Sequence, residues 1–154
     1  MESEIAAVYG GKVRVRACGL CLSDGKLLLV NHQMQENSDF WALPGGGVEF
    51  GHSIRATVER ELREETGLTG RCGDFLFACE YIKEPLHAVE LFFLVTELSG
   101  KLRTGNDPEL QIIQDVRFLD QAEIDNLPLA NLHGIFTIQR KITDLMTLNG
   151  FYTL

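Results

Sequence analysis

Residues 13–30 form two apolar stretches that are separated by one polar break. These stretches lie between Val13 and Val30 and flank the dipeptide Asp24-Gly25. The dipeptide suits a tight turn between antiparallel strands, because both of its residues tolerate a positive φ. The pattern therefore predicts a β-hairpin, followed by a polar loop from His32 to Phe40.

The clearest helical segment runs from Ile54 to Thr66, which contains no proline and no interior glycine. Ser53 stands just before it and belongs to the residue types that cap a helix N-terminus. Gly67 stands just after it, where glycine ends helices because it adopts a left-handed conformation without steric cost. These boundary residues predict a helix over Ile54 to Thr66.

The second half of the chain is predicted to add strands and then helices. Dense aromatic and aliphatic residues indicate strands at Phe75 to Ile82, Ala88 to Leu98 and Ile112 to Leu119. Two terminal helices are indicated at Asp120 to Leu127 and Leu132 to Met146, the latter by its helical spacing of apolar residues. Pro85 and the segment Ser99 to Pro108 mark breaks. This order predicts an α/β fold with a mixed sheet packed between helices.

Composition and charge narrow the classes of function. The chain has 154 residues, 45% of them hydrophobic and 23% charged, which fits a single folded domain over residues 1–154. Its 14 Lys and Arg against 22 Asp and Glu give a formal charge of −8. Such a molecule repels nucleic acid polymers and anionic membranes, so we expect neither as a partner. Binding of phosphate groups would need a metal ion or a local basic patch.

The N-terminus and the cysteines bear on the compartment. Met1 to Gly10 lacks the basic start and apolar segment of a secretory signal, so we expect a cytoplasmic protein. The longest apolar runs are far shorter than the roughly 20 residues that a membrane helix needs. The C-x-x-C pair lies in an apolar, strand-like run, so we expect buried free thiols at Cys18, Cys21, Cys72 and Cys79.

Three glutamates of the predicted helix have the spacing of a metal site. Glu61, Glu64 and Glu65 stand at i, i+3 and i+4, so at about 100° per residue their oxygens can converge on one point. Glu65 projects at the angle of the apolar stripe that contains Val58 and Leu62, and a carboxylate turned toward a core is costly without a cation. Mg²⁺ takes oxygen ligands of this kind.

The alternative interpretation is a solvated acidic helix stabilised by the pairs Glu59–Arg63 and Arg60–Glu64. The glycines just upstream favour the metal site. Gly45, Gly46 and Gly47 form a segment in which the backbone can approach a ligand closely and a carbonyl can face an ion.

The segment from Gly46 to Leu68 resembles the Nudix box, G-x5-E-x7-R-E-U-x-E-E-x-G-U, where U is aliphatic. The matching residues are Gly46, Arg60, Glu61, Leu62, Glu64, Glu65, Gly67 and Leu68. The resemblance extends from Val13 to Leu127 and implies the family's α/β/α sandwich. One position departs from the pattern, because His52 stands in place of the first glutamate.

Carried over residue by residue, the resemblance implies roles for these positions. The resemblance assigns metal binding to Glu61, Glu64, Glu65 and the carbonyl of Gly46. Arg60 corresponds to the arginine that orients the neighbouring glutamate, a role that suits a planar guanidinium. Many relatives use a carboxylate from a later loop as a ligand or base. Glu109 is the candidate here, with Asp107 second and simple solvation of the loop as the alternative.

The implied chemistry is attack of water on a phosphorus of a pyrophosphate linkage, with Mg²⁺ or Mn²⁺ as cofactor. The substrate would be a small nucleoside diphosphate derivative, such as a nucleoside triphosphate or a nucleotide sugar. Gly45 and Gly46 are candidates for substrate contact through their backbone, and Phe40 and Trp41 for stacking on a base, although most such aromatics belong to a core.

Two questions stay open at the level of sequence. His52 either alters metal affinity and preference, with Mn²⁺ favoured, or acts only as a hydrogen-bond partner near the site, where Glu49 partly replaces the missing charge. If hydrolysis is lost, the chain is a Nudix-fold nucleotide-binding or regulatory module. Many family members pair, so a homodimer is one arrangement that the resemblance allows.

Overall fold

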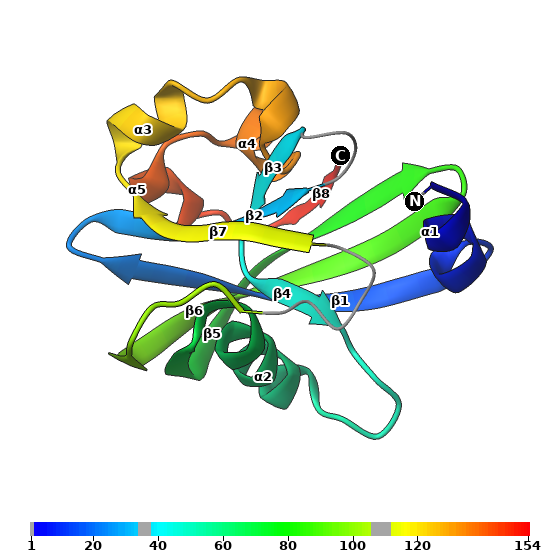
Figure 1. The fold of residues 1–154 in the computed structure, drawn as a ribbon, viewed down its shortest axis with the longest axis horizontal. Helices are drawn as coiled ribbons and strands as arrows, with labels where there is room; N and C mark the ends of the chain where they lie inside the picture. Colours follow the sequence, from blue (N-terminus) through cyan, green and yellow to red (C-terminus); the bar gives the residue numbers. More distant parts are fainter. Residues whose placement is uncertain (1, 34–37, 106–111) are drawn as a thin grey trace.

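A mixed β-sheet forms the centre of the molecule in the computed structural model, which describes residues 2–33, 38–105 and 112–154 (Figure 1). In these residues the strand order is β3-β2-β1-β6-β5-β8, with β4 paired to β1 and β7 paired to β2. The pairs β1–β6 and β5–β8 are parallel and the other pairs are antiparallel. The strands are β1 Val13–Ser23, β2 Lys26–Gln33, β3 Asp39–Ala42, β4 Gly45–Gly47, β5 Leu68–Lys83, β6 Leu86–Gly100, β7 Ile112–Leu119 and β8 Phe151–Thr153.

Helices cover the sheet on two sides, as Figure 1 shows with α2 apart from the group formed by α3, α4 and α5. Among the described helices, none combines the length and the apolar character needed to span a membrane. The predicted α/β/α sandwich with a mixed sheet is therefore confirmed. The helices are α1 Glu2–Tyr9, α2 Ile54–Thr66, α3 Gln121–Asp125, the 3₁₀ turn η1 Leu129–Asn131, α4 Ile135–Ile138 and α5 Ile142–Leu145.

Two hydrophobic clusters join these layers. On the α2 side, Val58 and Leu62 pack with Leu28 and Val95 from the sheet. On the other side, the C-terminal helices pack on a larger cluster that includes the stacked pair Phe77 and Phe92, whose ring centroids lie 4.6 Å apart. The sheet therefore has a buried contact on both faces, and α2 is held firmly against one of them.

The hairpin and α2 have the predicted positions. Asp24 and Gly25 have φ values of 51° and 75°, as a two-residue turn of this type requires. The Ser53 hydroxyl accepts a hydrogen bond from the Ala56 N–H at 3.0 Å, and Gly67 ends the helix in the left-handed region at φ 78°. Local capping chemistry therefore fixes the start and the end of α2.

The prediction of one helix from Leu132 to Met146 is wrong. The chain forms α4 and α5 instead, and Gln139 between them is extended at φ −148° and ψ 118°. The guanidinium of Arg140 turns away and donates to the carbonyls of Ile124, Asp125 and Leu127 at the end of α3. The Leu127 N–H already donates to the Ile124 carbonyl at 3.1 Å. The guanidinium adds a charged donor to this carbonyl and to those of Asp125 and Leu127, which favours two short helices.

Other elements extend or add to the prediction. β5 begins at Leu68 rather than Phe75, and its register shifts between Thr69 and Phe77 disguise the alternation of a regular strand. The predicted loop from His32 to Phe40 contains the end of β2 and the start of β3, and its residues 34–37 lie outside the described part. β6 reaches Gly100, and α1 and β8 were not predicted.

The expectation of buried free thiols is confirmed, since all four cysteines are free and buried. Burial raises the pKa of Cys21 to about 12, and burial together with the charge of Glu90 raises the pKa of Cys79 to about 12. Both side chains are therefore uncharged core residues at neutral pH.

A buried polar network connects the central strands to the glycine strand β4. Glu90 on β6 lies opposite Arg16 on β1, and Arg16 Nη1 donates to Glu90 Oε2 at 2.6 Å. His133 Nδ1 accepts from the Ile135 N–H at 3.0 Å, so its Nε2 carries the proton that it donates to Glu90 Oε1 at 2.7 Å. The second Nη of Arg16 donates to the carbonyl of Gly45 at 3.3 Å. Glu90 therefore positions the Arg16 guanidinium, which contacts β4 through the Gly45 carbonyl.

Replacement of Glu90 by Gln tests this network. Burial raises the pKa of Glu90, but His133 and Arg16 outweigh it and lower the pKa from 4.5 to about 2. The carboxylate therefore stabilises the fold fully above about pH 4.5, and this contribution is lost as the pH falls toward 2. We expect E90Q to lower the free energy of unfolding by about 3 kcal/mol at pH 7, because Arg16 loses its buried partner.

Denaturant unfolding of both proteins at pH 7 and at pH 3 measures this effect. The difference between them should shrink at the lower pH. An equal difference at both pH values would show that the charge of Glu90 is not what stabilises the network.

Candidate metal centre

The glutamates of α2 share one face of the helix but differ in exposure. The side chains of Glu61 and Glu65 are 3% and 0% exposed, whereas that of Glu64 is 39% exposed. This order follows from their spacing, because Glu65 lies in line with the buried Val58 and Leu62 and Glu64 lies one step toward solvent. The apolar contacts that hold α2 on the sheet therefore also bury two carboxylates.

The glycine strand β4 lies directly against these carboxylates. Its pairing with β1 places Gly46 opposite Ala17 and Gly45 opposite Cys18. The Gly45 N–H donates to Glu65 Oε1 at 2.8 Å. A Cβ at Gly46 would lie 2.5 Å from the carboxyl carbon of Glu61, so the close approach of β4 requires glycine there.

Arg60 connects the exposed and buried carboxylates. Its Nη2 donates to Glu61 Oε1 at 3.0 Å, while its Nη1 lies 3.4 Å from Glu49 Oε2. Its Nε lies 3.9 Å from Glu64 Oε1. The Arg60 guanidinium thus lies close to three carboxylates. Its shortest contact is the hydrogen bond to Glu61, which fixes the orientation of that side chain.

A histidine that the sequence analysis missed borders the deepest carboxylate. His32 on β2 is 4% exposed, and its Nε2 lies 4.0 Å from Glu65 Oε2. A polar residue in the buried strand Lys26–Gln33 is the signal that could have identified it, but its partner lies on an element far away in the sequence.

Hard oxygen donors dominate this region, and this decides which ion fits. Among the described residues, no three His, Cys, Asp or Glu side chains already form a closed set of metal ligands. One oxygen, Glu64 Oε2, is buried and has no hydrogen-bond partner in the described part of the chain. Carboxylate oxygens with such spare capacity suit Mg²⁺ or Mn²⁺, which keep several water ligands and need only a few from protein.

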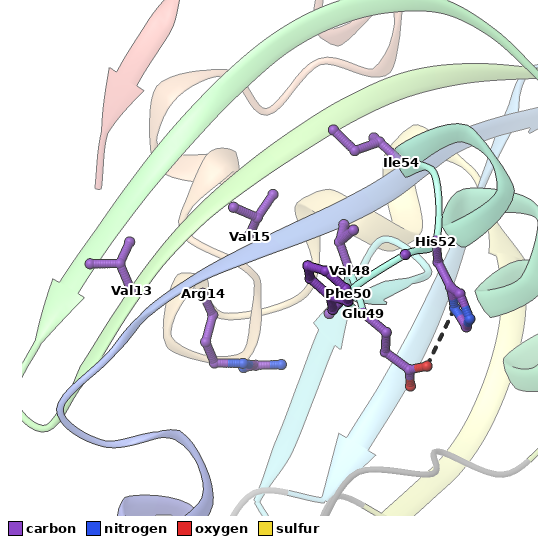
Figure 2. Close-up of a pocket in the computed structure, with 10 residues that line it drawn as sticks. Val13, Arg14, Val15, Val48, Glu49, Phe50, His52 and Ile54 are labelled. Atoms are coloured by element: carbon purple, nitrogen blue, oxygen red, sulfur yellow. Dashed lines mark ion pairs between the residues drawn. The ribbon is translucent and has the colours of Figure 1, made fainter.

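His52 lies at the edge of this arrangement rather than among its glutamates. Its side chain is 51% exposed, with Nδ1 3.3 Å from Glu49 Oε2, the ion pair dashed in Figure 2. The same nitrogen lies 3.4 Å from Arg60 Nη1. His52 therefore contacts Glu49 and Arg60.

The remaining predicted residues are more scattered. Trp41 is 4% exposed in the core, with the Arg117 guanidinium 5.4 Å from its ring centre, which leaves little surface for stacking. Phe40 is partly buried, and its ring centroid lies 6.3 Å from that of His133. Glu109 and Asp107 lie outside the described residues.

Two adjoining pockets beside the glutamates share the residues Arg14, Gly47, Val48 and Glu49. The larger pocket, of about 560 Å³, includes His52 and the apolar side chains seen in Figure 2. The smaller pocket, of about 270 Å³, includes Glu61 as well as Tyr9 and Lys12.

The two cationic residues of this lining, Lys12 and Arg14, were not among the site residues predicted from the sequence. Basic and aliphatic residues alternate over positions 12–16, and this strand-like pattern is the signal that places the cations on one face.

The chain also resembles known proteins. A family model described as NUDIX domain matches residues 12–140. The chain is 30% identical over 112 residues to an ADP-ribose pyrophosphatase of Methanocaldococcus jannaschii, covering 71% of this chain and 62% of that relative's length. It is 30% identical over 104 residues to an 8-oxo-dGTP diphosphatase of Buchnera aphidicola, covering 68% of this chain and 75% of the relative.

The fold is also shared with solved structures. A NUDIX hydrolase from Nitrosomonas europaea superposes with a TM-score of 0.73 at 15% identity, covering 92% of this chain and 78% of that one. Likeness at this low identity bears on the fold alone. Since the family model spans most of the sequence, including the glycine strand and the glutamate helix, the chain belongs to the Nudix family.

Proposed function

We propose that this chain is a pyrophosphohydrolase that uses Mg²⁺ or Mn²⁺ to cleave the diphosphate linkage of a small nucleoside diphosphate derivative. One observation carries the proposal. The buried carboxylates Glu61 and Glu65 stand against a strand of glycines, and the Gly45 N–H binds Glu65 at 2.8 Å. Burial of two carboxylates is costly in a purely structural helix, and a bound cation would compensate for it.

We assign metal binding to Glu61, Glu64, Glu65 and the carbonyl of Gly46. A divalent ion held there would neutralise charge on phosphate oxygens and lower the pKa of an attacking water. Arg60 orients Glu61 through the 3.0 Å contact, and the Gly45 N–H fixes Glu65. The protein thereby sets the direction of its ligands before substrate arrives.

A proton must leave the attacking water, and we assign its acceptance to Glu64. This carboxylate is the most exposed of the three, and its Oε2 has no hydrogen-bond partner among the described residues. Its contact with Arg60 Nε at 3.9 Å is longer than a hydrogen bond, so a proton can be accepted without breaking one. Glu109 remains our candidate for a further base or ligand.

The names of the relatives support the substrate class. One is an ADP-ribose pyrophosphatase and another is an 8-oxo-dGTP diphosphatase, and both names specify nucleotides with linked phosphates. We propose a substrate of this class, with the backbone of Gly45 and Gly46 near its phosphates. Phe40 is only partly buried and is the better candidate for contact with a base, because Trp41 is buried.

Substitution of Glu65 by Gln tests the metal site. The amide oxygen can still accept from the Gly45 N–H, so we expect the variant to fold, but the lost charge should reduce turnover on the order of 100-fold or more. The measurement is release of phosphate and pyrophosphate from nucleoside triphosphates, nucleotide sugars and ADP-ribose, with Mg²⁺ and separately with Mn²⁺. Direct titration with Mn²⁺ should show weaker binding by the variant.

Glu59 offers a matched control on the same helix. Its Oε2 also accepts a backbone hydrogen bond, from the Cys72 N–H at 2.8 Å, but it projects from a different face of α2. E59Q should retain the turnover of the unchanged protein. Full activity of E65Q would overturn the metal assignment. Absence of turnover in the unchanged protein with both ions would favour the nucleotide-binding module.

His52 provides a second test of the site. Because its half-exposed ring contacts Glu49 and Arg60 rather than the metal-site glutamates, replacement by Glu should change turnover by less than about fivefold, the range of exposed ion pairs. Turnover of H52E is compared with each metal. An increase of tenfold or more would instead mean that His52 weakens metal binding.

A further inference from the structure

The smaller pocket beside Glu61 brings two cationic side chains together in a strongly acidic chain. Lys12 and Arg14 line it together with Glu49 and Glu61, whereas the protein as a whole has a formal charge of −8. Its volume of about 270 Å³ lies just below the range of roughly 300–1,000 Å³ typical of pockets for drug-sized ligands. The pocket therefore suits a small anionic group better than a whole nucleoside.

The N-terminal helix holds Arg14 in place. The Gly10 N–H donates to the Ala6 carbonyl at 2.9 Å, and Gly11 at φ 72° turns the chain from α1 into β1. This turn brings the ring of Tyr9 to 3.9 Å from Arg14 Cζ. A guanidinium packed on an aromatic ring loses less freedom when it binds an anion, since part of that freedom is already lost.

The same pocket reaches one of the metal-site glutamates. Its lining includes Glu61, and Gly47 lines it without a side chain. Glu49 also lines it, but its Oε2 lies 3.3 Å from His52 and 3.4 Å from Arg60. Figure 2 shows Val13 and Val15 on the opposite side of β1 from Arg14, so the guanidinium is directed away from the apolar part of the larger pocket.

From this placement we propose that Lys12 and Arg14 form a phosphate subsite, which binds a phosphate group beyond the diphosphate linkage at the metal centre. The inference rests on the proposed function and deepens it. Guanidinium binds phosphate oxygens in a bidentate manner, and an ammonium group adds a point charge. The chain therefore selects substrates with three or more linked phosphates over those with two. Tyr9 belongs to α1, which precedes the family match over residues 12–140.

Titration calorimetry with inorganic tripolyphosphate and with pyrophosphate tests the subsite, in excess Mg²⁺ and again with EDTA. We expect R14Q to weaken tripolyphosphate binding about tenfold, equivalent to about 1.4 kcal/mol, and pyrophosphate binding by less than threefold. K12Q should show the same preference with a smaller effect. Because Lys12 is exposed, K12Q tests the subsite even if R14Q disturbs α1.

Arg71 provides the charge-matched control. Its side chain is 76% exposed on β5, and R71Q removes the same charge at a position that is not part of the pocket lining. Equal tripolyphosphate affinities of R14Q, K12Q and R71Q would overturn the subsite, whatever the turnover. Equal loss of pyrophosphate and tripolyphosphate binding would overturn the selection for longer chains.

The proposed function can fail separately from the subsite. If the unchanged protein shows no turnover while R14Q still weakens tripolyphosphate binding, hydrolysis is wrong and the subsite stands. If E65Q abolishes turnover but R14Q binds tripolyphosphate as tightly as the unchanged protein, hydrolysis stands and the subsite is wrong.

Discussion

The hydrogen bond from the Gly45 N–H to the buried carboxylate of Glu65 is the interaction on which the site depends. A carboxylate that is 0% exposed cannot be solvated by bulk water, so it needs donors or cations from its surroundings. The Gly45 N–H is available because β4 lies close to α2. That approach is possible only because Gly46 has no side chain to collide with Glu61. The buried charge of Glu65 therefore depends on the glycines of β4, because only residues without side chains can come this close to α2.

The same strand also contacts the buried polar network of Arg16, Glu90 and His133. Arg16 contacts the Gly45 carbonyl, and Glu90 fixes Arg16 together with His133. Gly45 thus links two sets of buried charges through its own amide and carbonyl groups, one set on α2 and the other on β1 and β6. Buried polar groups satisfied in this way favour one arrangement of the backbone over its neighbours. A site that must direct carboxylates toward an ion benefits from such rigidity.

Local chemistry explains why part of this could be predicted from sequence. Ser53 and Gly67 cap α2 through contacts within a few residues, and the spacing of the glutamates fixes which face they share. The break between α4 and α5 depends instead on carbonyls 13 to 16 residues before Arg140, which no local pattern reveals. His32, Glu90 and the packing of Tyr9 on Arg14 likewise gain their meaning only from the folded sheet. The alternation around Arg14 was visible in the sequence, but its position beside Glu61 was not.

The parallel pairing of β1 with β6 has a consequence for how the protein acquires its site. Arg16 and Glu90 are 74 positions apart, so their contact closes a long loop of chain that already contains β4 and all of α2. Contacts this distant in sequence form slowly, because the entropy of closure is lost before the contact is gained. During synthesis the glycine strand and the glutamate helix leave the ribosome before the strand that secures them. The carboxylates can therefore be in a helix early, but their fixed geometry is a late product of folding.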